Sequence, residues 1–244
     1  MNGAFQRTRR LIGDAAMEKL VHSRVAVFGL GGVGGSCVEA LARSGVGTLD
    51  LIDSDEVVLS NLNRQAFAAV HTIGMKKTDA AKERIADIAP SAAVNLYPIF
   101  YLPDTAETIP FAEFDYVVDA IDTVTAKIDL ILRAKEAGVP IISCMGTGNR
   151  LDPSLLTIKD IYKTYGDPLA KVMRHELRKR NVESLDVCCS AEDPIRPLEE
   201  AEEEDRGNRR SVPASSAFVP PAAGILIASH VVRHLICEPE KPHK

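Results

Sequence analysis

The sequence contains no C-x-x-C pair, although it has five cysteines, which are Cys37, Cys144, Cys188, Cys189 and Cys237. Zinc sites with four thiolate ligands are usually built from two such pairs, so their absence argues against a structural zinc ion. Five is also an odd number, and we expect reduced thiols in a cytoplasmic protein. Tryptophan is absent as well, but the composition, 45% hydrophobic and 26% charged, is otherwise that of a globular protein.

An excess of positive charge is missing too, because the formal net charge is −5. This balance argues against a chain that coats nucleic acid nonspecifically, although it is compatible with a local basic patch. No apolar run has the length of a membrane span: Ser229 and His230 interrupt the longest, at residues 222–232, and prolines precede it. The basic N-terminus lacks the apolar stretch of a signal peptide. We therefore expect no membrane association.

Short apolar segments alternate with segments of helical spacing over the first 150 residues. Residues 24–30, RVAVFGL, predict a buried strand that ends in glycine, and residues 48–53, TLDLID, predict another after a helix. Further strands are predicted at residues 94–99, 116–121 and 140–144, and further helices at residues 76–88 and 126–137. The alternation predicts an α/β fold with a Rossmann-like, doubly wound and mostly parallel sheet.

Three regions follow from this pattern. We expect an N-terminal helical arm at residues 1–22, a Rossmann-like core at residues 23–150 and a C-terminal extension at residues 151–244. Within the extension we predict a strand at residues 155–161, a helix at 167–180, an exposed and mobile acidic loop at 199–210 and a closing helix at 221–236. No linker rich in Pro or Ser separates the regions, so the extension continues the first domain.

A glycine phrase, GLGGVG, lies between the first predicted strand and the helix after it. In such a turn the first glycine permits the bend, the second lets the backbone approach phosphate, and the third packs helix against strand. Gly29, Gly31 and Gly34 fill these positions, and Gly32 adds a fourth glycine. Asp53 ends the next strand, where its carboxylate can accept hydrogen bonds from ribose hydroxyls. The phrase in this context predicts a nucleotide site.

A second polar phrase, SNLNRQ at residues 60–65, bears on which nucleotide is bound. Nicotinamide binding is the default meaning of the glycine phrase, but a redox cofactor needs no further cations near its phosphates. Asn61, Arg64 and Lys77 can bring donors and positive charge to the β and γ phosphates of a triphosphate, where charge grows as the α–β bond breaks. Asp122, at the carboxyl end of a parallel strand, can hold Mg²⁺. We therefore favour ATP cleavage over hydride transfer.

Four phrases in this order, GLGGVG, LIDSDEVVLSNLNRQ, GMKK and VVDAIDTV, resemble the adenylating domain shared by ubiquitin-activating enzymes and their bacterial relatives for molybdopterin and thiamine synthesis. The nucleotide-binding residues that the resemblance implies are Gly29, Gly31, Gly32, Gly34, Asp53, Asp55, Asn61, Asn63, Arg64, Lys77 and Asp122. The catalytic residues that it implies are Arg10, Arg64, Lys77 and Asp122, of which Asp122 is also the magnesium ligand. Arg10 matches an arginine that a partner subunit supplies to the phosphates, which implies a homodimer.

Two later phrases, GTGNRLDP at residues 146–153 and KTYGDPLAKVMRHELRKR at residues 163–180, resemble the subfamily of tRNA threonylcarbamoyladenosine dehydratases. This resemblance implies that the enzyme adenylates the threonyl carboxylate on adenosine 37 of tRNA, after which attack from within the same side chain closes a ring and releases AMP. Because the nucleophile belongs to the substrate, no enzyme cysteine is required. A monovalent cation and a cysteine desulfurase or sulfurtransferase partner are further candidates.

Three other functions stay open. Members that activate ubiquitin-like sulfur carrier proteins usually have the paired cysteine motifs that this chain lacks, so a metal analysis separates that alternative. A nicotinamide-binding protein is separated by titration with ATP and with NADH. A nucleotide-sensing scaffold for a sulfur-transfer partner would show no pyrophosphate exchange.

Basic residues gather on the helix predicted at residues 167–180. Lys171, Arg174 and Arg178 follow one another at the spacing of a single helix face, and Lys179 and Arg180 lie beside them. Contacts of such side chains with phosphate position RNA without reading its sequence. With the resemblance, this face is predicted to bind tRNA.

Overall fold

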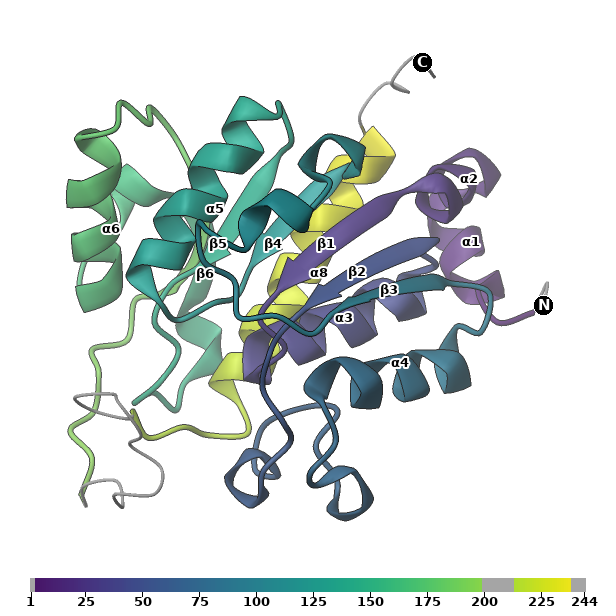
Figure 1. Cartoon of the computed structure of the whole chain (residues 1–244), viewed down its shortest axis with the longest axis horizontal. Coiled ribbons are helices and arrows are strands. Elements are labelled where there is room, and N and C mark those ends of the chain that lie inside the picture. Colours follow the sequence, from purple (N-terminus) through teal and green to yellow (C-terminus); the bar gives the residue numbers. More distant parts are fainter. Residues whose placement is uncertain (1–2, 199–212, 238–244) are drawn as a thin grey trace.

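The computed structural model describes residues 3–198 and 213–237, and within them a single sheet runs through the molecule (Figure 1). Its strands are β1 (Arg24–Phe28), β2 (Thr48–Ile52), β3 (Ala93–Tyr97), β4 (Tyr116–Asp119), β5 (Ile141–Cys144), β6 (Leu156–Asp160) and β7 (Asp186–Ser190). Their spatial order is β3-β2-β1-β4-β5-β7-β6. All neighbouring strands are parallel except β6, which is antiparallel to β7. The predicted Rossmann-like, mostly parallel sheet is confirmed.

Helices cover both faces of this sheet (Figure 1). They are α1 (Gln6–Ile12), α2 (Asp14–His22), α3 (Gly32–Ser44), α4 (Lys77–Ile88), α5 (Val124–Glu136), α6 (Pro168–Arg178) and α8 (Val219–Cys237). Alternate residues of β1 face opposite cores: Val25 and Val27 pack with α2, α3, α4 and α8, whereas Ala26 and Phe28 pack with α5 and α6. Burial on both faces explains the nearly continuous apolar run of this strand.

The structure contains a strand, β7, that was not predicted from the sequence. It lies between β5 and β6, parallel to the first and antiparallel to the second. Four consecutive residues of β7 are buried, so its sequence, DVCCS, has no alternation that would mark a strand. The sheet therefore continues into residues 151–198, and the C-terminal extension shares the core of the first domain.

The closing helix α8 is long and apolar enough to cross a membrane by length and composition alone. The prediction that no segment here reaches that length was therefore too strict. However, a Cβ added to Gly224 would lie 2.2 Å from the carbonyl oxygen of Val33 in α3, so the two helices are in backbone contact. Ile227 and Val231 are buried in the core that α3 shares. This is the packing of a core helix, and such helices meet the same criterion.

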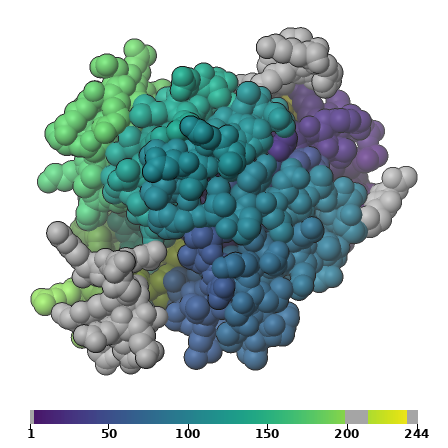
Figure 2. Space-filling view, viewed as in Figure 1, coloured from purple at the N-terminus to yellow at the C-terminus, as the bar shows by residue number. Residues whose placement is uncertain are grey.

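The N-terminal arm consists of α1 and α2, at the end of the molecule away from α6 (Figures 1 and 2). Met17 and Leu20 anchor α2 in the core, whereas no residue of α1 is buried. The acidic loop predicted at residues 199–210 lies outside the described residues.

Candidate active site

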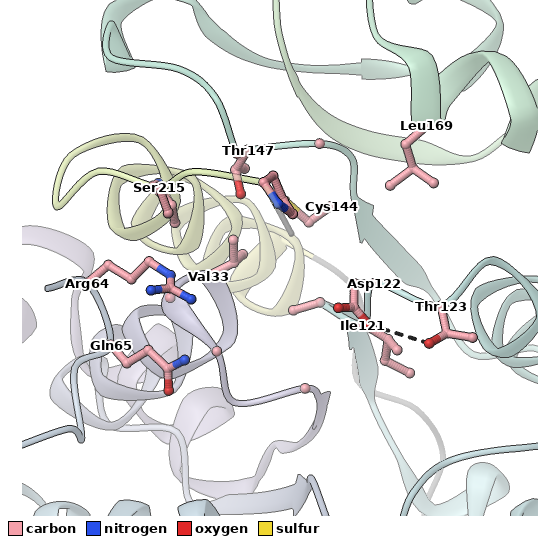
Figure 3. A pocket seen from close by; sticks show the side chains of 18 of the residues that line it. Val33, Arg64, Gln65, Ile121, Asp122, Thr123, Cys144, Thr147, Leu169 and Ser215 are labelled. Carbon is pink, nitrogen blue, oxygen red and sulfur yellow. Dashed lines mark hydrogen bonds between the residues drawn. The ribbon is translucent and has the colours of Figure 1, made fainter. Parts of the chain in front are cut away.

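A pocket of about 780 Å³ opens where β1, β2, β4 and β5 end. The connections after β1 and β4 lead to helices on opposite faces of the sheet, so the strand order reverses between these neighbours. Open α/β sheets bind ligands at such a switch point. Figure 3 shows Arg64 and Gln65 on one side of the pocket, Asp122 and Thr123 on another, and Thr147 and Leu169 on a third.

Three of the four glycines of the turn after β1 have a steric reason in this structure, and Gly31 does not. Gly29 has a φ of 88°, and a Cβ on it would lie 2.7 Å from the carbonyl oxygen of Ala120. A Cβ on Gly34 would lie 1.7 Å from the carbonyl oxygen of Gly29, so this glycine lets α3 pack on the turn. Gly31, at the start of α3, has no atom within 4 Å of an added Cβ and lines the pocket. Gly32 packs against Pro220 and Arg64.

These contacts predict that the same change, glycine to alanine, affects mainly stability at Gly34 and mainly ATP binding at Gly31. Gly34→Ala forces a methyl group into a backbone oxygen and is expected to lower the free energy of unfolding by about 1–3 kcal/mol or more. Gly31→Ala adds its methyl group to open space, should cost less than about 1 kcal/mol, and should instead weaken ATP binding. Urea unfolding and ATP titration measure both effects. Equal destabilisation by the two substitutions would contradict this account.

Asp53 follows β2 and fixes the glycine turn. One carboxylate oxygen accepts a hydrogen bond from the Leu30 amide at 2.6 Å, and the other accepts one from the Asp55 amide at 2.8 Å. Burial raises the pKa of the Asp53 carboxyl, and the positive charge of Lys77 opposes this rise. The carboxylate lines the pocket beside the turn, and each oxygen retains acceptor capacity for a hydroxyl.

Lys77 and Asn61 also line the pocket. The Lys77 ammonium is nearly buried and forms an ion pair with Asp55, with Nζ 2.7 Å from Oδ2. The side-chain oxygen of Asn61 accepts a hydrogen bond from the Val58 amide at 3.2 Å, which leaves the amide nitrogen as a donor. Asp55 thus lies in the pocket as predicted, but as the partner of a cation.

Arg64 reaches the pocket from the loop after the 3-10 turn η1 (Leu59–Asn61) (Figure 3). Its guanidinium donates hydrogen bonds to the Ser60 carbonyl at 2.9 Å and to the Asn63 side chain at 2.8 Å. Asn63 was also predicted to bind the nucleotide, but it does not line the pocket in this structure. Its amide donates to the Ser215 carbonyl at 3.1 Å, so Asn63 instead holds Arg64 and the segment before α8 together.

Asp122 rests on a buried polar network that sequence reasoning missed. Lys127 and Asp119 are fully buried, and the lysine Nζ lies 3.0 Å from the carboxylate and 2.9 Å from the Ile121 carbonyl oxygen. Ser143 of β5 donates to the same carboxylate at 2.5 Å. The network therefore fixes the backbone just before Asp122, whose carboxylate lines the pocket and accepts a long hydrogen bond from Thr123 (Figure 3).

Comparison with known proteins places this geometry in a family. The model of the ThiF family matches residues 5–243. The chain belongs to the ThiF family. It is 42% identical over 239 residues to the tRNA threonylcarbamoyladenosine dehydratase of Bacillus subtilis, which covers 95% of this chain and 94% of that one. The resemblance drawn from the sequence phrases is confirmed.

Solved structures agree with this assignment. The crystal structure of the Escherichia coli tRNA N6-threonylcarbamoyladenosine dehydratase in complex with ATP superposes with a TM-score of 0.86 and 30% identity, over 96% of this chain and 93% of that one. A molybdopterin-synthase adenylyltransferase of Escherichia coli is 39% identical over 127 residues, 52% of this chain and 50% of that one. The relatives of this chain thus include both a named dehydratase and a named adenylyltransferase.

Arg10 is exposed on α1 of this ThiF-family chain and does not line the pocket. The arm packs near the turn before β2, where Phe5 approaches Gly45. This end of the sheet is opposite to the carboxyl ends of the strands, where the pocket opens (Figure 1). Arg10 therefore cannot serve the pocket of its own chain in this arrangement.

The basic residues of α6 are divided by their contacts. Arg174 is half-buried and donates to the hydroxyl of Thr164, and the Arg178 guanidinium lies 5.0 Å from the centre of the Tyr162 ring. Lys179 and Arg180 both pair with Glu176, at 2.9 and 2.7 Å. Lys171 is exposed near the start of the helix. The predicted face is basic, but much of its charge is already engaged within the protein.

Three buried cysteines, Cys37, Cys188 and Cys189, have raised thiol pKa values, which disfavours the nucleophilic thiolate. Burial raises the pKa of Cys37 and Cys189, and a hydrogen bond with Cys144 together with burial raises that of Cys188. Cys144 lines the pocket, and its thiol donates to the Met145 carbonyl. Within residues 3–198 and 213–237, no group of three or more Cys, His, Asp or Glu side chains is arranged to hold a metal ion.

Proposed function

We propose that this protein is an ATP-dependent dehydratase that acts on threonylcarbamoyladenosine in tRNA. The observation that carries the proposal is the similarity to named dehydratases over nearly the whole of both chains, including a structure that contains ATP. The pocket supports it with a glycine turn, a ribose acceptor and several cations, as a triphosphate requires. We place the enzyme in the cytoplasm, where its tRNA substrate is found.

The proposed reaction has two steps, adenylation and then cyclisation. A carboxylate oxygen of the threonyl group attacks the α phosphorus of ATP, and the bond to the β phosphate breaks with release of pyrophosphate. The acyl carbon of the adenylate is then attacked by a nucleophile in the same side chain, which gives up its proton as the ring closes, and AMP leaves with the former carboxylate oxygen. The net change in the nucleoside is the loss of one water. The protein aligns the reactants and neutralises the charge that grows on the leaving phosphates.

We assign the nucleotide contacts to the residues that meet in the pocket. The backbone at Gly31 and Gly32 would face the phosphates, and Asp53 the ribose. Asn61, Arg64 and Lys77 would donate to the β and γ phosphates; Lys77 is already held against Asp55 for this purpose.

Asp122 and Asp55 are carboxylates of the same pocket, which fits Mg²⁺, because this ion is commonly held by one or two carboxylates and the substrate phosphates. When bound, Mg²⁺ supplies charge neutralisation on the phosphate oxygens. A monovalent cation is a further proposed ligand without an assigned site.

A homodimer is proposed from the position of Arg10. Its helix lies away from the pocket of its own chain, so a phosphate contact by Arg10 requires a second copy. The tRNA is proposed to contact α6, with Lys171 and Arg178 as its most available cations on the predicted face. A cysteine desulfurase or sulfurtransferase partner stays a prediction.

Mass spectrometry of tRNA nucleosides tests the proposed function. Modified tRNA incubated with the protein, ATP and Mg²⁺ should yield an adenosine derivative lighter by one water, with one AMP formed per event. Omission of ATP is the control and should leave the nucleoside unchanged. If instead the nucleoside keeps its mass while a ubiquitin-like carrier protein becomes adenylated, the alternative activity shared by adenylyltransferases of the family replaces this proposal.

A further inference from the structure

One side of the pocket is built by residues to which the proposed function assigns no nucleotide contact. We define the acceptor wall as residues 145–150, which follow β5, and residues 167–169, where α6 begins. Much of the surface it contributes is neutral, from Met145, Thr147 and Leu169, which suits a nucleoside better than a phosphate chain. Figure 3 shows Leu169 on the side of the pocket away from Arg64 and Gln65.

A buried ion pair joins the two segments of the acceptor wall. The Arg150 guanidinium lies 3.2 Å from Oδ2 of Asp167, and both side chains are almost completely buried. The same guanidinium donates to the Gly146 carbonyl, and the Gly146 amide donates to Asp167 at 3.1 Å. Buried ion pairs contribute little net stability compared with apolar packing, so such a pair in a pocket wall points to a geometric role.

Asp167 is also the N-cap of α6. Its second oxygen, Oδ1, accepts a hydrogen bond from the Ala170 amide at 2.8 Å in the first helical turn. One carboxylate therefore holds the loop after β5 through one oxygen and the helix through the other. Three hydrogen bonds of Asp167 thus link the loop after β5 to the first turn of α6.

The helix fixed in this way carries the exposed cations Lys171 and Arg178. We propose that Asp167, together with Arg150, is a positioning pair that holds the acceptor wall in register with α6, so that RNA phosphates on the helix and the modified nucleoside at the wall are aligned with ATP. The proposal rests on the proposed function, since it assigns the acceptor side of the same pocket. Misplacement of a reacting group by about 1 Å can lower a rate by about 100-fold, which is the effect that such a pair prevents.

The test uses variants that keep the helix cap but lose the ion pair. Asp167→Asn and Asp167→Ser both retain a good N-cap residue and remove the charge that faces Arg150. With intact modified tRNA, kcat should fall about 100-fold, while the dissociation constants for ATP and tRNA stay within about threefold of those of the parent. Activities are normalised to the ATP-binding stoichiometry, so a loss of folded protein does not imitate the effect.

Two further variants separate positioning from stability. Asp160→Ser is the matched control, because Asp160 caps the 3-10 turn η6 (Ile161–Lys163) and accepts from the Leu185 amide, yet does not line the pocket. It should leave kcat unchanged. Arg150→Met should lower kcat as Asp167→Asn does. The kcat of the double variant should be no lower than that of the slower single variant, because the pair acts as a unit.

The possible failures are distinguishable. Parent protein that forms no AMP with modified tRNA defeats the proposed function. Active parent protein with Asp167 variants whose kcat stays within about threefold overturns the positioning role alone, and so does an equal loss in Asp160→Ser.

Discussion

Replacing Asp122 by alanine is expected to lower the rate of AMP formation by about 100- to 1,000-fold. The side chain lines the pocket at the end of β4, and a buried network holds the backbone before it, so its carboxylate is presented in a fixed place. Asp122→Asn keeps the size and removes the charge, and it should raise the Mg²⁺ concentration required for half-maximal rate. Both are measured as AMP release from modified tRNA over a series of Mg²⁺ concentrations.

A matched control separates this effect from a general loss of surface charge. Asp104 is an exposed carboxylate outside the pocket, and Asp104→Ala should leave the rate unchanged. Circular dichroism establishes that each variant is folded. Turnover of Asp122→Asn close to that of the parent, with an unaltered Mg²⁺ requirement, would remove the proposed magnesium role.

Lys127→Ala is expected to lower the free energy of unfolding by about 3–5 kcal/mol. The substitution leaves the carboxylate of Asp119 buried without its cation, and it also opens a cavity beneath α5. Unfolding in urea measures the change. Because the same ammonium holds the Ile121 carbonyl, any folded fraction should also turn over more slowly.

Lys135→Ala provides the comparison, because Lys135 lies on the same helix but is exposed. Its effect on the free energy of unfolding should stay within about 0.5 kcal/mol. A loss below about 1 kcal/mol in Lys127→Ala would show that water or a neighbour replaces the ammonium, which would contradict the structural role given to it.

Most of the fold could be predicted from local sequence patterns. The glycine turn and the apolar runs predicted β1, α3 and β2 within a few residues, because both strands are buried on both faces and the first leads into a glycine of positive φ. The same reasoning failed for β7, where a short segment containing two cysteines has no periodic pattern. Its strand character comes from the two neighbours that enclose it, which is information about tertiary structure.

The site residues that could be predicted from the sequence are those whose charge suits them to bind phosphate or a metal ion. Arg64, Lys77 and Asp122 line one pocket, as expected from charged side chains after parallel strands. Asn63 does not line this pocket, because adjacent residues of a loop can point in different directions and the sequence does not show which. Arg150 and Asp167 lie far apart in the chain, and only the packing of α6 against the loop after β5 brings them together.

The contact between Gly32 and Pro220 has a consequence for how the site is made during synthesis. A Cβ on Gly32 would lie 2.9 Å from the proline ring, so the beginning of α8 packs against the glycine turn that is proposed to face the phosphates. During translation the glycine turn is synthesised early, whereas α8 is synthesised near the end. A growing chain on the ribosome therefore has an incomplete nucleotide site. We expect it to use ATP only after α8 has packed against the turn.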